Sequence, residues 1–143
     1  MNKRLLVVDD EAANLFAYRK LFMQTGMEVD TAETVEEAGA MLEQNEYCLV
    51  LTDIRFNSVG DEGGFAIMEM TKKLQPRSRV IMITAYGDKS TEQRAYRLGA
   101  DLYLEKPVPF AVLRGKLVEL GLIEDAIQAA AMGRKKSVKG QAQ

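Results

Sequence analysis

Short apolar runs alternate with longer amphipathic segments along this chain. The runs Leu5–Val8, Cys48–Leu51 and Val80–Ile83 are continuously apolar and do not alternate with polar residues. Strands that are buried on both faces have this pattern, because helices cover both sides of a parallel sheet. Glu28–Ala32 and Asp101–Leu104 carry a weaker form of the same signal. The pattern therefore predicts five strands.

Between and after these runs lie segments with the apolar spacing of a helix. Their ends carry boundary signals: Thr34 stands at an N-cap position, Pro76 follows as a stop signal, and Gly99 stands where a C-terminal cap is expected. The predicted helices are Ala12–Gln24, Val35–Gln44, Phe65–Leu74, Ser90–Leu98 and Phe110–Leu120.

This order, a strand followed by a helix five times, determines the predicted fold class. Short connections force parallel strands and right-handed crossovers. We predict an α/β fold, a (βα)5 doubly wound sheet of five parallel strands with the flavodoxin-like strand order 2-1-3-4-5. The length of 143 residues suits one such domain. In such sheets functional groups gather outside the carboxyl ends of the strands.

Polar residues stand at the carboxyl ends of four predicted strands. Asp9 and Asp10 follow the first strand, Asp53 the third, Thr84 the fourth and Lys106 the fifth. The predicted fold brings these side chains to one edge of the sheet. Clustered carboxylates suit a hard cation, and Mg²⁺ fits best because it binds carboxylates together with waters or phosphate oxygens. Lys106 offsets the remaining negative charge and can hold a phosphate oxygen.

Composition narrows the chemistry further. The chain has no histidine, which excludes a Ser-His-Asp triad, a histidine metal site and a histidine general base. Its one cysteine, Cys48, allows no internal disulfide and fits a buried thiol. A net charge of −2 predicts no affinity for nucleic acid or membrane surfaces. Because no apolar run approaches a membrane span and the start turns acidic too early for a secretory signal, we expect a cytoplasmic protein.

Four short motifs at these positions carry a family resemblance. They read VVDDE, LTDIR, ITAYGD and GADLYLEKP. In this order and spacing they resemble the receiver domain of two-component response regulators, over roughly Lys3 to Leu120. The resemblance implies a phosphorylation-activated signalling switch of a phosphorelay, a phosphoprotein rather than an enzyme. Such a domain catalyses only the phosphorylation and dephosphorylation of its own aspartate.

The resemblance also implies a role for each residue at the predicted edge. Asp53 is the phosphoacceptor and takes the phosphoryl group from a phosphohistidine on a sensor histidine kinase or a phosphotransfer protein. Asp10 binds Mg²⁺ directly, Asp9 acts mainly through water, and the backbone carbonyl of Arg55 supplies a further ligand. Thr84 is the switch hydroxyl that moves to bond the phosphoryl group.

Further residues complete the implied set. Lys106 contacts a phosphoryl oxygen, and the peptide bond from it to Pro107 is often cis in the family. Tyr103 is the aromatic switch that turns inward when the hydroxyl moves. Arg55 and Tyr86 stand two residues beyond the phosphoacceptor and the switch hydroxyl, where the family tunes the lifetime of the phosphoryl group.

The expected output is protein–protein binding, because 143 residues leave no room for a second domain of typical size. The resemblance places it on the face of the fourth helix, fifth strand and fifth helix, which would bind a downstream target or a second copy. We expect no membrane contact and no direct nucleic-acid binding by this chain. The alternative is the N-terminal receiver of a longer regulator that controls an output domain, for example one for transcription.

Two segments depart from the family pattern. After Asp53 the family's proline is absent, and the loop around residues 57–64 is about three residues longer than usual. This is either a tolerated surface insertion or a change in Mg²⁺ access or partner choice. The receiver is expected to span residues 1–121. Residues 122–143 would form an extension, with a short helix followed by a basic tail or linker that is disordered.

Three other classes of protein stay open on sequence alone. A Mg²⁺-dependent phosphatase with an aspartate nucleophile needs a second acid two residues later, where this chain has Arg55. A flavodoxin-like cofactor binder needs a phosphate-cradling loop where this chain has acids. A receiver-like scaffold that no longer takes phosphate is opposed by the complete residue set, although the unusual loop leaves it open.

Overall fold

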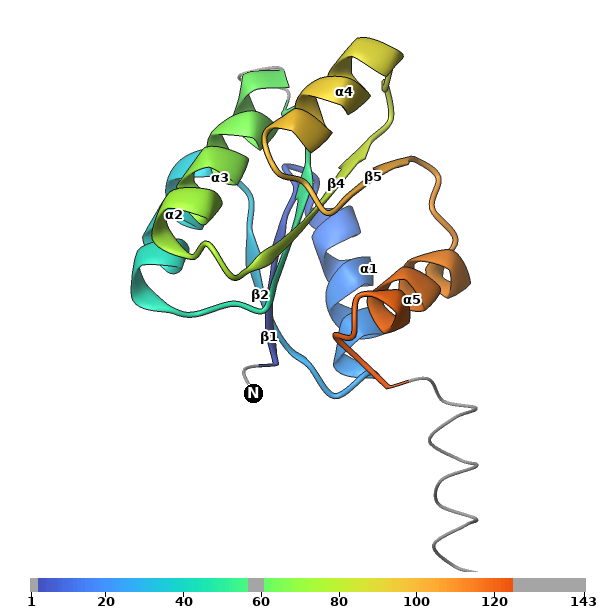
Figure 1. Cartoon of the computed structure of the whole chain (residues 1–143). Coiled ribbons are helices and arrows are strands. Elements are labelled where there is room, and N and C mark those ends of the chain that lie inside the picture. Colours follow the sequence, from blue (N-terminus) through green and yellow to red (C-terminus); the bar gives the residue numbers. More distant parts are fainter. Residues whose placement is uncertain (1–2, 57–60, 125–143) are drawn as a thin grey trace, which may run out of the picture. The chain divides into compact units, whose positions relative to one another are not determined.

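Five parallel strands form one sheet with the order β2-β1-β3-β4-β5 (Figure 1). The computed structural model describes residues 3–56 and 61–124. The predicted fold class and strand order are confirmed. The strands are β1 (Arg4–Val8), β2 (Glu28–Ala32), β3 (Leu49–Asp53), β4 (Arg79–Thr84) and β5 (Leu102–Glu105).

Burial explains why three strands gave the clear sequence signals. The central strands β1, β3 and β4 are buried along almost their whole length, whereas the edge strands β2 and β5 are partly exposed. Cys48 precedes β3 and is half-buried rather than fully buried, with its Sγ donating to the Arg4 carbonyl at 3.4 Å. The expectation of a plain buried thiol is therefore only partly correct.

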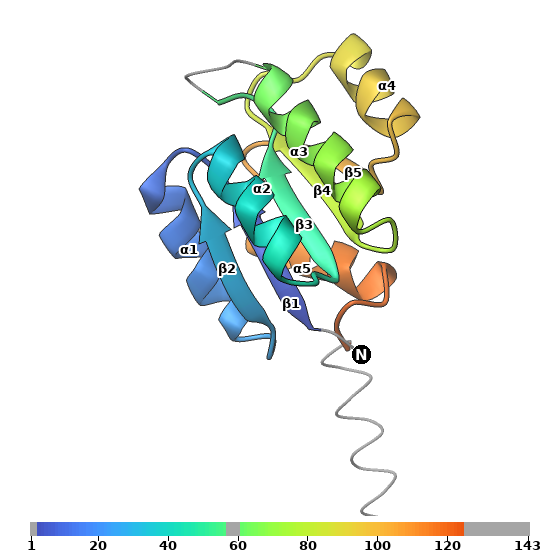
Figure 2. The ribbon, with the colours of Figure 1, turned by 90° about the vertical axis from the view of Figure 1, so that its left-hand side faces the viewer.

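Four helices pack around this sheet: α1 (Ala12–Met23), α2 (Val35–Gln44), α3 (Asp61–Leu74) and α4 (Lys89–Arg97). Helix α1 packs against β1 and β2. Helices α2 and α3 lie side by side over the other face, and α4 lies against β5 (Figure 2). No described helix is long and apolar enough to cross a membrane.

The chain divides after Val108 into two units, of which the first holds the sheet and α1 to α4. The second contains α5 (Phe110–Glu119), which begins after Pro109 and carries Lys116 in its last turn. The domain boundary expected at residue 121 stays a prediction. Most of the predicted extension, residues 125–143, lies outside the described residues.

Two helix starts show how local sequence and tertiary contacts each set a boundary. The Thr34 hydroxyl accepts a hydrogen bond from the Glu37 N–H at 3.1 Å, which confirms the predicted cap of α2. Helix α3 begins at Asp61, whereas the sequence predicted Phe65, so part of the expected long loop is helical.

Gly64 packs α3 closely against the chain after β3. Its N–H donates to the Ile54 carbonyl at 2.9 Å. A Cβ at this position would lie 2.5 Å from Cα of Ile54. Glycine at this position therefore allows close packing of α3 against the chain after β3. Residues 57–60 of the predicted loop lie outside the described residues.

Candidate functional site

Strand ends bring the predicted site residues to one edge of the sheet. Asp9 directly follows β1, while Asp53 and Thr84 are the last residues of β3 and β4. The parallel register pairs Asp53 with Ile83 and Thr84 with Glu105, so these strands end at nearly the same level. Lys106 directly follows β5, at the same level. The peptide bond between Lys106 and Pro107 is cis.

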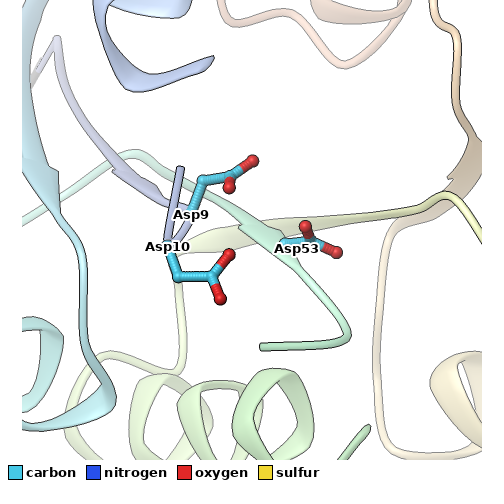
Figure 3. A group of neighbouring side chains, drawn as sticks. All are labelled: Asp9, Asp10 and Asp53. Carbon is cyan, nitrogen blue, oxygen red and sulfur yellow. The ribbon is translucent and has the colours of Figure 1, made fainter. Parts of the chain in front are cut away.

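Three carboxyl groups gather at this edge. Asp9, Asp10 and Asp53 each offer an oxygen within 4.8 Å of the others (Figure 3). Asp9 is only 2% exposed, and the other two are partly buried. Negative charges at this spacing repel one another, and burial strengthens the repulsion. The cluster therefore favours a positive group, and its oxygens are those that a hard divalent cation prefers.

Lys106 supplies a positive charge inside the cluster. Its Nζ donates to Oδ2 of Asp53 at 3.0 Å and to Oδ2 of Asp9 at 3.3 Å. Burial lowers the pKa of Lys106, but the hydrogen bonds and charges of the two aspartates outweigh it and raise that pKa above its ordinary value. Burial raises the pKa of Asp53, against the opposing effect of Lys106. Lys106 therefore stays an ammonium group at neutral pH.

Two further groups donate hydrogen bonds to the Asp9 carboxylate. Its Oδ1 accepts from the Glu11 N–H at 2.9 Å, and its Oδ2 also accepts from Nδ2 of Asn14 at 3.2 Å. The sequence prediction did not include Asn14. The only signal for Asn14 in the sequence was a polar residue in the first turn of the helix that begins beside the acids.

Two larger side chains lie over the mouth of the site. The Asp53 Oδ1 accepts from the Arg55 N–H at 3.3 Å, and the Thr84 Oγ1 accepts from the Tyr86 N–H at 3.2 Å. The Arg55 guanidinium lies 5.8 Å from the centre of the Tyr86 ring, within range of a cation–π interaction. The cleft they border has a volume of about 340 Å³ and is lined by Asp10, Glu11, Asp53, Arg55, Phe56, Ala85, Tyr86 and Lys106.

Tyr103 lies on β5 with its side chain turned inward. It is 6% exposed, and its backbone N–H donates to the Tyr96 hydroxyl at 3.1 Å. Thr84 is also buried. The cleft is thus lined by five of the predicted residues, Asp10, Asp53, Arg55, Tyr86 and Lys106. Asp9, Thr84 and Tyr103 are buried and do not line it. The roles assigned to these residues stay predictions.

The chain is similar in sequence to response regulators. The sequence profile of the response regulator receiver domain matches residues 5–118. The alginate biosynthesis transcriptional regulatory protein AlgB of Pseudomonas aeruginosa is 33% identical over 104 residues, which cover 73% of this chain and 22% of AlgB. The chain spans about half the length of the curated relatives it matches, or less.

Two solved structures share the fold at appreciable identity. A CheY-like receiver domain protein from Methanospirillum hungatei is 33% identical with a TM-score of 0.77, covering 83% of this chain and 93% of that one. The response regulator TrrA of Thermotoga maritima, solved in complex with Mg²⁺–BeF, is 30% identical with a TM-score of 0.71 and covers 82% of this chain and 98% of its own.

Proposed function

Since the chain belongs to the response regulator receiver domain family of two-component systems, we propose that Asp53 accepts a phosphoryl group from a partner protein and thereby switches the binding properties of the domain. The observation that carries the proposal is the position of Asp53. Its carboxylate lies 3.0 Å from the Lys106 ammonium and shares a cluster with Asp9 and Asp10. The donor is a phosphohistidine on a sensor histidine kinase or a phosphotransfer protein.

Asp53 acts as the nucleophile in this proposal. One of its carboxylate oxygens forms a bond to phosphorus, while the bond from phosphorus to the donor's imidazole nitrogen breaks. The electron pair of the broken bond stays on that nitrogen, and the product is an acyl phosphate. A carboxylate is a weak nucleophile, so most of the catalysis must come from positioning and from charge stabilisation. Lys106 provides the positive charge that stabilises the transferring phosphoryl group, and the Arg55 N–H helps to orient the Asp53 carboxylate.

The residues present fit a bound Mg²⁺ ion. Asp10 and Asp53 line the cleft and would hold the ion directly, with the backbone carbonyl of Arg55 as a further ligand. Asp9 already accepts three hydrogen bonds, so it would act through water and by holding Lys106. When bound, Mg²⁺ neutralises negative charge on the phosphoryl oxygens. The Mg²⁺–BeF that TrrA holds supports this assignment.

The phosphoryl group on Asp53 changes the local charge, and a two-state element must respond to it. We propose that Thr84 and Tyr103 form this element, since both are buried beside the loop that follows β4. The output surface then includes α4 and β5. Tyr96 of α4 is 44% exposed, and Leu98, the C-cap of α4, is 39% exposed. It would bind a downstream protein or a second copy. In a longer regulator it would act on an output domain, as the name of AlgB suggests for that protein.

Arg55 and Tyr86 are proposed to protect the phosphoryl group from water. Both line the cleft, and they contact each other across its mouth. Loss of either side chain opens a path for water to the acyl phosphate. We therefore expect Arg55→Ala and Tyr86→Ala each to shorten the half-life of the phosphorylated protein several-fold, while the site of phosphorylation stays the same.

The deciding experiment is intact mass spectrometry after incubation with acetyl phosphate and Mg²⁺. The proposal predicts a gain of about 80 Da that is absent in Asp53→Asn and absent without Mg²⁺. A phosphohistidine donor protein provides the second arm. If neither donor adds the mass, the domain is a scaffold that takes no phosphate. Turnover of a generic phosphomonoester would instead favour the phosphatase class, and a bound yellow chromophore would favour a flavodoxin-like binder.

A further inference from the structure

Gly87, in the loop between β4 and α4, lies next to the buried side chain of Tyr103. The Tyr103 side chain is 6% exposed, and its hydroxyl makes no hydrogen bond within the described residues. The backbone of Asp88 interacts with that hydroxyl only weakly. A buried hydroxyl without a hydrogen bond costs free energy, which offsets part of the gain from burying the ring.

Gly87 provides the space that the Tyr103 hydroxyl occupies. A Cβ added at Gly87 would overlap the hydroxyl oxygen of Tyr103, and it would lie 3.0 Å from Cζ of Tyr103 and from Cγ2 of Thr84. The positive-φ glycines of the described chain are Gly26, Gly99 and Gly121. Gly87 is not among them, so its backbone conformation does not require glycine. What the glycine contributes is room.

From this geometry we propose that Gly87 is a positioning residue. Gly87 has no side chain, so Tyr103 can pack inward beside Thr84. The residue at position 87 thereby sets the population of the inward state. The inference rests on the proposed function only for the role of the inward state in signalling. The existence of the inward state is a property of the structure itself.

The surroundings determine what moves when Gly87 becomes larger. Asp88 is the N-cap of α4 and accepts a hydrogen bond from the Thr91 N–H at 2.7 Å, so a shift of the loop would disturb this cap. The Tyr103 backbone is fixed in β5 and donates to the Tyr96 hydroxyl. A rotation of the Tyr103 side chain breaks neither contact, and it returns the hydroxyl to water. Rotation of Tyr103 is therefore the expected response.

The test is Gly87→Ala, with the exposure of Tyr103 measured by NMR on protein carrying ¹³C-labelled tyrosine rings. A soluble paramagnetic reagent reports exposure, and Tyr103→Phe assigns the signal among the five tyrosines. We expect the inward population to fall at least tenfold. Gly115→Ala is the matched control, since nothing lies within 4 Å of an added Cβ there. It should leave Tyr103 unchanged.

A double variant separates a steric effect from general damage. Adding Tyr103→Phe to Gly87→Ala removes the hydroxyl that the new methyl would overlap. With ¹³C-labelled phenylalanine rings, we expect the ring at position 103 to be buried again. If Gly87→Ala alone does not fold, Gly87→Ala with Tyr103→Ala should fold, because the space is then free. The inference is overturned if Tyr103 stays buried in Gly87→Ala, or if removing its ring fails to restore folding.

Failure of this inference differs from failure of the proposed function. Ring exposure is measured without any phosphodonor, so the Gly87 result is readable even if Asp53 takes no phosphate. An unmodified chain that gains no mass from either donor refutes the proposed function alone. A chain that gains the mass but keeps Tyr103 buried in Gly87→Ala refutes the inference alone.

Discussion

Replacing Asn14 with leucine should loosen the site without removing a predicted metal ligand. Nδ2 of Asn14 donates to Oδ2 of Asp9 at 3.2 Å, and Lys106 reaches the same oxygen at 3.3 Å. A carboxylate only accepts hydrogen bonds, so the amide nitrogen, and not the amide oxygen, must face it. Leucine is close to asparagine in size but donates nothing. On that oxygen, Asp9 is then held by Lys106 alone.

The size of the effect follows from this geometry. A hydrogen bond to a charged group contributes about 1.5–3 kcal/mol. Asn14 is only half-buried, so water replaces part of the lost bond. We expect Asn14→Leu to lower the free energy of unfolding by about 1 kcal/mol. Lys106 is also drawn toward Asp9 and away from Asp53, and a similar energy in the transition state slows phosphorylation about fivefold.

The assay is the rate of mass gain at Asp53 over a range of acetyl phosphate concentrations, together with urea unfolding. Asn45→Leu is the matched control, because Asn45 is also half-buried and its Nδ2 donates to the Tyr47 hydroxyl at 3.4 Å. Asn45 precedes β3, whereas Asp53 is at the other end of that strand. Asn45→Leu should change stability but not the phosphorylation rate. A normal phosphorylation rate and an unchanged free energy of unfolding in Asn14→Leu would refute the reasoning.

Other substitutions test the packing and the charges around the site. Gly64→Ala should lower the free energy of unfolding by about 2–3 kcal/mol, seen as a lower urea midpoint, because the new Cβ meets the Ile54 backbone; an unchanged midpoint would show that α3 shifts freely. Thr34→Ala should cost about 1 kcal/mol by loss of the α2 cap, measured by thermal melting followed by circular dichroism; an unchanged melting temperature would contradict this. Arg94 forms a two-point ion pair with Glu62 and lowers the pKa of that carboxyl by its hydrogen bond and charge. A group with a lowered folded-state pKa stabilises above its unfolded pKa and loses this as the pH falls through the folded value, so the stability difference between the unmodified chain and Glu62→Gln should vanish in acid; a difference independent of pH would refute it.

The sheet was the most predictable part of the fold. Strands β1, β3 and β4 are buried on both faces, so their apolar runs are nearly continuous and easy to identify. The start of α3 was not predictable in the same way. Glycine disfavours helices locally, and the contact of Gly64 with the Ile54 backbone exists only in three dimensions.

The residues of the site also differ in whether the sequence predicts them. Asp53, Thr84 and Lys106 were predictable because a parallel sheet brings its strand ends together. Asn14 and Gly87 were not, because neither follows a pattern in the sequence. Their importance depends on single distances, to a carboxylate oxygen in one case and to a tyrosine hydroxyl in the other.

The contact between Asp9 and Lys106 has a consequence for the protein during its synthesis. The two residues are 97 positions apart in the chain. At a translation rate of about 5–20 residues per second, a ribosome adds Lys106 about 5–20 s after Asp9. Until then a nascent chain carries the aspartates made so far without Lys106, the residue after β5 that balances them in the folded structure. The carboxylate cluster therefore gains its lysine only after β5, the last strand of the sheet, has been made.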